Sequence, residues 1–238
     1  MLEHEDREFI ADGRCIAHVM NGNASPDGGV TPILQADQLC FGYPQQPLLF
    51  NSLSVRISAG VTWVRGGEGR GKTTLLRLLA GDLPALSGRL RINDIDLGEQ
   101  PAAYAQQVFW IDGRSEAFHQ VSALDYIARL QAHYPCFTQQ RVGALLAGLS
   151  LTEHQHKPLY MLSTGSRRKV WLTAGLASGA AVLLLDDPFA ALDKPSIAFA
   201  TDHLKEAAKE ANIARAIVVA HYEAPESVPL AGVIDLGD

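Results

Sequence analysis

A glycine-rich stretch, Gly66–Thr73, reads GGEGRGKT and matches the pattern G-x-x-x-x-G-K-[ST]. Glycines in this pattern allow backbone N–H groups to converge on phosphate oxygens, and the lysine adds a positive charge at the β- and γ-phosphates. The hydroxyl that follows the lysine faces the magnesium ion of a bound nucleotide. The stretch therefore predicts a nucleotide phosphate site built from Gly66, Gly67, Glu68, Gly69, Arg70, Gly71, Lys72, Thr73 and Thr74.

The flanking residues separate this interpretation from a glycine-rich turn with a surface lysine. Before the glycines, Val61–Arg65 reads VTWVR, a short strand. After them comes TTLLRLLAG, whose leucines at positions 75, 76, 78 and 79 fall on one face of a helix. Gly81 is placed to end that helix. A strand, a glycine loop and a helix in this order are the context of a P-loop.

Two adjacent aspartates, Asp186 and Asp187, end the apolar run Val182–Leu185. Two neighbouring carboxylates repel each other and resist burial unless a cation binds beside them. In P-loop ATPases a strand ends on an aspartate that binds Mg²⁺ beside the P-loop. We expect Asp186 to be this metal-side carboxylate, and Asp187 to point toward the γ-phosphate and activate a water molecule. Without a P-loop the same pair would indicate only an acidic turn.

The pattern of apolar runs predicts the elements that position these residues. Leu48–Ile57 alternates as a strand does, and the uninterrupted runs VLLL and AIVVA are typical of parallel strands covered on both faces. Residues 114–170 show helical periodicity throughout. We expect an α/β fold: a P-loop NTPase core with a mostly parallel sheet, an N-terminal antiparallel β subdomain and a helical insert. Further strands are expected at residues 90–92, 108–111, 182–185, 216–220 and 233–236.

The chain has 238 residues, of which 47% are apolar, and a net charge of −6, which argues against nucleic acid as its main partner. Residues 1–31 are expected to be a flexible leader, with a short helix over Phe9–Met20, and residues 32–238 the folded domain. The acidic N-terminus has no apolar segment of the kind found in signal peptides. The uncharged, mostly apolar run Val170–Leu185 is shorter than the ~20 residues that a membrane span needs.

A third motif, LSTGSRRK at residues 162–169, lies after the glycine loop and before the strand that ends on the two aspartates. It resembles the LSGGQ-type signature of the ATP-binding cassette (ABC) family, and the order of the three motifs is similar to the order in that family. A serine and a glycine at a helix N-terminus offer free N–H groups to phosphate. The resemblance implies that Ser163, Gly165 and Ser166 contact the ATP bound by the P-loop of another protomer.

The resemblance covers about residues 32–238 and implies further roles. Tyr43 resembles the aromatic residue that stacks on adenine, and Ala191–Asp193 resembles the D-loop that crosses the dimer interface. His221, after the run AIVVA, resembles the switch histidine that contacts the γ-phosphate. The family resemblance thus implies Lys72, Asp187 and His221 as catalytic residues and Thr73 and Asp186 as ligands of Mg²⁺.

Two positions differ from the family pattern. The family usually has glutamate where this chain has Asp187, and a misplacement of roughly 1 Å can cost ~10²-fold in rate. The family also has a glutamine after the strand predicted at residues 108–111, where this chain has Asp112. A carboxylate at that position can bind Mg²⁺ through water, so we include Asp112 among the metal candidates.

The leading functional hypothesis is the ATPase subunit of a membrane ABC transporter. It implies the cofactors ATP and Mg²⁺, a second cassette in a homodimer or heterodimer, a membrane-spanning subunit on a separate chain, and a cytoplasmic position on the inner face of the cell membrane. One alternative is a slow or degenerate cassette that acts as an ATP-dependent regulatory clamp. Another is a soluble ABC ATPase that acts on ribosomes or DNA.

Overall fold

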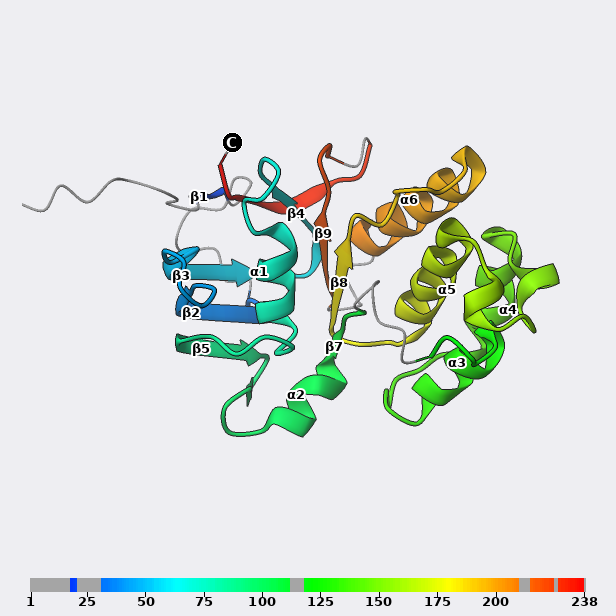
Figure 1. The fold of residues 1–238 in the computed structure, drawn as a ribbon, viewed down its shortest axis with the longest axis horizontal. Coiled ribbons are helices and arrows are strands. Elements are labelled where there is room, and N and C mark those ends of the chain that lie inside the picture. The colour runs from blue at the N-terminus through cyan, green and yellow to red at the C-terminus, as the bar shows by residue number, and fades with distance from the viewer. Residues whose placement is uncertain (1–17, 21–30, 112–117, 210–214, 225–226, 238) are drawn as a thin grey trace, which may run out of the picture.

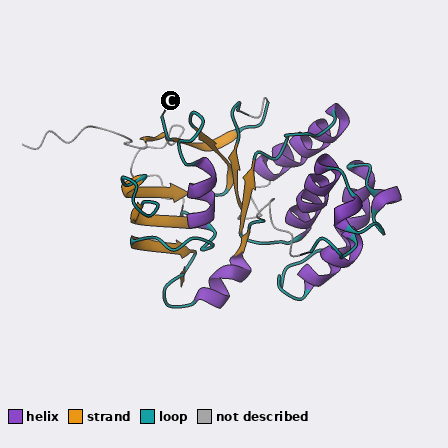
Figure 2. Ribbon diagram, in the orientation of Figure 1, coloured by secondary structure: helices purple, strands orange, loops and turns teal. Residues whose placement is uncertain are grey.

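The computed structural model describes residues 18–20, 31–111, 118–209, 215–224 and 227–237, which form two sheets and several helices (Figures 1 and 2). The larger sheet has the order β1 (His18–Met20), β10 (Leu230–Asp235), β4 (Gly60–Arg65), β9 (Ala216–Ala220), β8 (Val182–Asp186) and β7 (Val108–Phe109). Every pair in it is parallel except β1 with β10. The smaller sheet is antiparallel, in the order β3 (Phe50–Ile57), β2 (Leu34–Phe41), β5 (Ser87–Ile92) and β6 (Ile95–Asp96).

Helices cover both faces of the parallel strands. Helix α1 (Lys72–Leu79) lies between the two sheets, whereas α3, α4, α5 and α6 gather on the other side (Figure 1). The elements between β7 and β8 are α3 (Ala123–Gln131), α4 (Gln139–Gly148), the 3-10 turns η1 (Thr152–His154) and η2 (Leu159–Met161), and α5 (Thr164–Ala177). This stretch is the expected helical insert. The remaining helices are α2 (Pro101–Gln107) and α6 (Lys194–Lys209).

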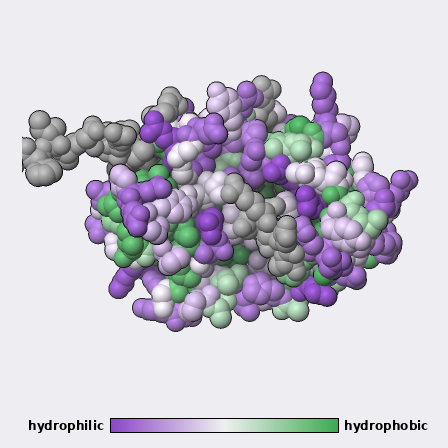
Figure 3. All heavy atoms as spheres, in the orientation of Figure 1, coloured by the Kyte–Doolittle hydropathy of each residue, from purple (hydrophilic) through white to green (hydrophobic). Residues whose placement is uncertain are grey.

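The core consists of two apolar clusters, one on each face of the parallel strands. In β8, Val182 and Leu184 face the cluster around α1, and Leu183 and Leu185 face the cluster formed with the helical insert. The four leucines predicted on one face of α1 are all fully buried in the first cluster. The space-filling view shows a mostly hydrophilic face with small separate apolar areas (Figure 3). Continuous apolar runs such as VLLL follow directly from burial on both faces.

Several details differ from the sequence-based expectations. Strand β2 was not anticipated, because a bulge at Gln38, whose φ is +50°, breaks the alternation of apolar and polar residues. The strand expected over 108–111 covers Val108–Phe109 alone. The helix expected over Phe9–Met20 is wrong for His18–Met20, which pair as a strand with β10, and the rest of that segment lies outside the described residues. Within the described residues, no helix has the length and apolarity needed to cross a membrane.

Candidate functional site

The glycine loop connects β4 to α1, which begins at Lys72. Gly69 and Gly71 have φ of +74° and +89°, in the left-handed region that favours glycine. A Cβ atom on Gly71 would also come within 2.8 Å of a Leu49 methyl group, so a side chain there would be strained and would have to displace that methyl. The Lys72 ammonium donates to the carbonyl oxygens of Gly66, at 2.6 Å, and Gly67, at 2.9 Å. The loop thus positions the lysine directly over its own backbone, in the compact form typical of a P-loop.

Thr73 and Asp186 meet at the carboxyl end of β8. The Thr73 hydroxyl donates to Asp186 Oδ2 at 2.7 Å, which joins the first turn of α1 to the end of the strand. Burial raises the pKa of the Asp186 carboxyl, and the nearby charge of Asp187 raises it further, against the hydrogen bond from Thr73. A cation beside this carboxylate offsets both of the effects that disfavour its charge. The hydroxyl and the carboxylate are oxygen ligands of the type that Mg²⁺ prefers.

Asp187 adopts an unusual backbone conformation, with φ of +47°. Its N–H donates to the Ala220 carbonyl oxygen at 2.8 Å, and its carboxylate oxygen Oδ1 lies 2.6 Å from His221 Nδ1. Because an ionised carboxylate only accepts, the histidine Nδ1 carries the proton of this bond. The His221 ring packs edge-on against Phe189, and Trp63 Nε1 donates to the His221 carbonyl oxygen at 3.0 Å. The acid and the imidazole are therefore held as a pair at the ends of β8 and β9.

A cleft of about 730 Å³ brings most of these residues together. Its lining includes residues 68–74 of the P-loop together with Asp186, Asp187 and His221. Tyr43 is not in the lining, but its hydroxyl is hydrogen-bonded to Thr74 Oγ1 at 3.0 Å, which ties it to the start of α1. Gly66, Gly67, Ser163, Gly165 and Ser166 also lie outside the lining, and Asp112 lies outside the described residues.

The signature-like stretch opens helix α5. Ser163 is its N-cap and accepts a hydrogen bond from Ser166 N–H at 3.1 Å. Gly165 packs against the loop after β8, where a Cβ atom would come 2.3 Å from the Ala191 carbonyl oxygen. Ala191 itself has φ of +60°. The stretch that resembles the signature and the stretch that resembles the D-loop are thus in direct contact within one chain.

An ion pair that the sequence did not single out strengthens this contact. Lys169, buried on α5, donates to Asp193 Oδ2 at 2.5 Å, and Asp193 Oδ1 accepts from Ser196 N–H at 2.9 Å at the start of α6. The hydrogen bond from Lys169, followed by that from Ser196, holds the pKa of the Asp193 carboxyl well below its usual range. Lys169 lies between the buried helix positions Gly165 and Val170. Because only the structure shows this burial, the sequence alone carried no signal for the ion pair.

Replacement of Asp193 tests this link. Asp193→Ala removes the cap of α6 and leaves a buried ammonium without its carboxylate, so we expect the free energy of unfolding at pH 7 to fall by about 1–3 kcal/mol. Asp193→Asn, which keeps a capping oxygen, should cost less. The pKa of Asp193 is lower in the folded protein than in the unfolded chain, so the stabilisation from its carboxylate is fully present above the unfolded-state pKa. This stabilisation is lost as the pH falls through the folded-state pKa. Urea denaturation at several pH values measures both effects. Asp202→Ala, at an exposed ion pair, is the control, and an equal loss there would contradict the prediction.

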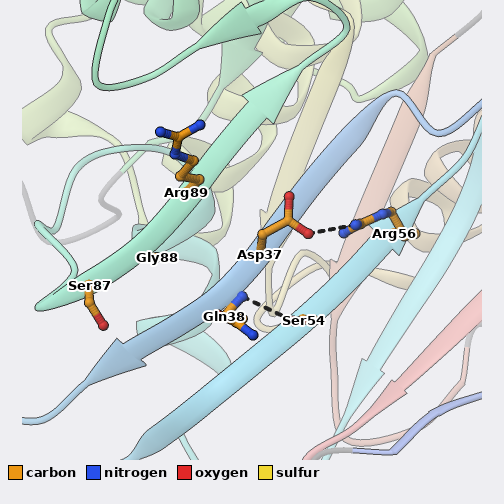
Figure 4. A pocket seen from close by; sticks show the side chains of 7 residues that line it. All are labelled: Asp37, Gln38, Ser54, Arg56, Ser87, Gly88 and Arg89. Carbon is orange, nitrogen blue, oxygen red and sulfur yellow. Dashed lines mark hydrogen bonds and ion pairs between the residues drawn. The ribbon is translucent and has the colours of Figure 1, made fainter.

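A second hollow, of about 740 Å³, lies on the antiparallel sheet (Figure 4). Asp37 and Arg56 form an ion pair there at 2.5 Å, and Gln38 N–H donates to Ser54 Oγ at 2.9 Å. Gly88 sits where a Cβ atom would come 2.6 Å from the Gln38 carbonyl oxygen, so the bulge of β2 shapes this hollow. No P-loop residue lines it, so this hollow is separate from the cleft at the ends of β4, β8 and β9.

The family model for the ABC transporter family, described as "ABC transporter", matches residues 50–190, which span the P-loop, the signature-like stretch and the two aspartates. The chain is an ABC ATPase. As a member of this family it binds ATP and is an ATP-hydrolysing subunit of an ABC transporter.

Relatives and solved structures agree with this assignment. The ABC ATPase is 32% identical over 200 residues to the cytochrome c biogenesis ATP-binding export protein CcmA of Cupriavidus pinatubonensis, which covers 82% of this chain and 86% of that protein. It is 32% identical to CcmA of Pseudomonas fluorescens, over 66% of this chain and 75% of that protein. An ATP-binding subunit of an ABC transporter has the same fold, with a TM-score of 0.72, 18% identity and coverage of 80% and 79%. A putative ABC transporter ATP-binding protein from Pyrococcus furiosus has a TM-score of 0.68 and 23% identity, with coverage of 85% and 96%.

Proposed function

We propose that this ABC ATPase powers an export system of the cytochrome c biogenesis type. The observation that carries the proposal is the similarity to CcmA proteins, which extends over 82% of this chain in one relative and is found in several Pseudomonas species. The membrane-spanning part belongs to a separate chain, which holds the ATPase on the cytoplasmic face of the membrane. ABC ATPase subunits work with such membrane subunits, and the described residues contain no spanning helix.

Within the cleft, the geometry supports a set of roles toward Mg-ATP. The P-loop backbone and Lys72 bind the β- and γ-phosphates, and Tyr43 lies on the adenine side. Thr73 and Asp186 hold Mg²⁺, with Asp112 as a further candidate, and the metal would neutralise phosphate charge as the γ-phosphoryl group departs. Asp187 accepts a proton from the attacking water, and His221 orients Asp187 through their hydrogen bond. The family fold and the paired acid and imidazole support these assignments.

A second cassette completes each site. Ser163, Gly165 and Ser166 lie outside the lining of the cleft in their own chain, although Thr164, Arg167 and Arg168 of the same stretch line it. The stretch forms the N-terminus of α5, an end of a helix suited to phosphate. The resemblance of this stretch to the family signature supports a dimer in which each signature stretch contacts the ATP of the partner. The same arrangement serves a homodimer and a heterodimer.

Ser163→Ala tests the shared site. We expect ATP binding by the monomer to stay unchanged and turnover to fall by roughly 10²-fold, because one donor to the partner's phosphates is removed. The loss of an N-cap also lowers stability by about 1 kcal/mol, so Ser122→Ala, which removes the equivalent cap of α3, is the matched control. Steady-state ATPase rates at several enzyme concentrations give the readout. Equal rates for the two variants would contradict a role for Ser163 beyond capping.

Complementation tests the export function. A Pseudomonas strain without its own CcmA would be supplied with this chain, and covalently bound haem in c-type cytochromes would be measured by haem staining. We expect haem-bearing cytochromes to return with the wild-type chain and not with Lys72→Ala. Failure of the wild-type chain, while its purified form hydrolyses ATP, would reject the proposed export system and keep the ATPase assignment.

One observation favours a second candidate, a slow cassette that acts as a regulatory clamp. Asp187 is one methylene shorter than the glutamate usual in the family, and it already forms a hydrogen bond with His221. If the wild-type chain binds ATP tightly and dimerises but shows no measurable ATP turnover, the clamp replaces the transport ATPase as the better account.

A further inference from the structure

A cavity of about 200 Å³ lies between α4, α5, α6 and the start of β9. Its position is opposite the nucleotide cleft, because the cleft is built at the carboxyl ends of the parallel strands and this cavity meets β9 at its first residues. Figure 1 shows α4, α5 and α6 gathered on one face of the parallel strands, with α1 on the other face. The apolar part of the lining comes from Ala144, Leu145, Leu176, Ala207 and Ile217.

Two arginines, Arg141 and Arg215, line this cavity. Arg215 donates to the Gly175 carbonyl oxygen at 2.7 Å and to Ser178 Oγ at 3.1 Å, so it also caps the carboxyl end of α5. Its Nε atom is buried and has no hydrogen-bond partner. Burial, followed by the charge of Arg141, lowers the pKa of Arg215 to about 10. Two like charges therefore lie close together in a partly enclosed space.

The single acid of the lining does not neutralise them. Glu206 lines the cavity, but within the described residues no ion pair joins it to Arg141 or Arg215. His203 Nδ1 lies 3.0 Å from the Phe199 carbonyl oxygen, to which it donates, so Nε2 of the neutral imidazole is an acceptor and the ring offers no further donor to an anion. The cavity thus combines an excess of positive charge, an unpartnered buried donor and an apolar floor.

We propose that this cavity binds a small organic monocarboxylate, with its carboxylate at Arg141 and Arg215 and its apolar body against Leu145 and Ile217. A guanidinium group matches a carboxylate in geometry and charge. Inorganic phosphate fits less well, because it has no apolar part to cover the floor. The volume is below the ~300 Å³ of ordinary ligand pockets, which limits the ligand to about one ring.

The probe is benzoate, titrated into the full-length, nucleotide-free protein and followed by calorimetry and NMR. We expect saturable binding in the millimolar range, and at least about tenfold weaker binding of benzamide, the neutral analogue of similar shape. Inorganic phosphate should bind more weakly than benzoate. Saturating ATP should leave benzoate binding unchanged, because the nucleotide cleft is at the other edge of the sheet.

Variants locate the site. Arg141→Gln should weaken benzoate about tenfold and leave benzamide unaffected, whereas Arg56→Gln, on the antiparallel sheet, should change neither. Arg215 is left intact because it caps α5. The proposal is overturned if benzoate does not saturate, if benzamide or phosphate binds as well as benzoate, if ATP displaces benzoate, or if Arg141→Gln binds benzoate like the wild type.

Discussion

The variant Lys72→Ala is expected to lose nearly all of its affinity for ATP and with it all measurable turnover. The Lys72 ammonium lies over the carbonyl oxygens of Gly66 and Gly67, and in the proposed site it pairs with the phosphates of the nucleotide. Removal of one partner from a desolvated charge pair costs about 2–5 kcal/mol, or roughly 30-fold to several-thousand-fold in dissociation constant. Equilibrium dialysis with labelled ATP measures the loss directly.

A matched control separates this effect from a general change in charge. Lys205→Ala removes a lysine from the exposed surface of α6, where it pairs with Asp202, and should leave ATP affinity unchanged. Thermal unfolding without nucleotide should be nearly the same for both variants and the wild type. Wild-type ATP affinity in Lys72→Ala would falsify the P-loop assignment.

The second large effect is expected at Asp187. Asp187→Asn keeps the shape of the side chain and its contact with His221 but removes the base, so kcat should fall roughly 10²–10⁴-fold with little change in ATP affinity. The variant should then accumulate as an ATP-bound dimer. Size-exclusion chromatography with ATP and Mg²⁺, next to a steady-state ATPase assay, records both results.

Asp187→Glu asks whether the short side chain limits the rate. The Asp187 side chain is half-exposed, so the longer glutamate has space to reach further toward the γ-phosphate, and we expect kcat to rise. The left-handed backbone at this position favours aspartate and asparagine over glutamate, so we also expect Asp187→Glu to lower the stability of the fold slightly. If Asp187→Asn hydrolyses ATP at the wild-type rate, the carboxylate is not the base, and His221 or Asp186 must take the proton instead.

Much of the fold was predictable because its parallel strands are buried on both faces. VLLL and AIVVA leave no polar positions, and their identification as central strands is confirmed. Strand β2 was missed because two residues at its bulge, Asp37 and Gln38, place polar side chains where the alternation required an apolar one. Short elements such as β7 and α2 carry too few residues for a period to show.

In the candidate site, too, some features were predictable from the sequence and others were not. Residues within one loop, such as Gly66–Thr73, could be found because their order alone encodes the geometry. Contacts between distant segments could not, and these include the bond of Tyr43 to Thr74, the bond of Asp187 to His221 and the pair Lys169–Asp193. Each of these depends on which elements lie side by side in the fold, which a single sequence does not state.

The packing of Gly165 against the Ala191 carbonyl has a consequence for how related chains are compared. Any side chain at this position would push the neighbouring loop away before a nucleotide or a second copy arrives. Selection for stability alone is therefore enough to keep a glycine here during evolution. A degenerate cassette that no longer turns over ATP is therefore expected to retain Gly165, which makes this glycine a poor marker of an active enzyme. Ser163 faces no such steric demand and is the better marker.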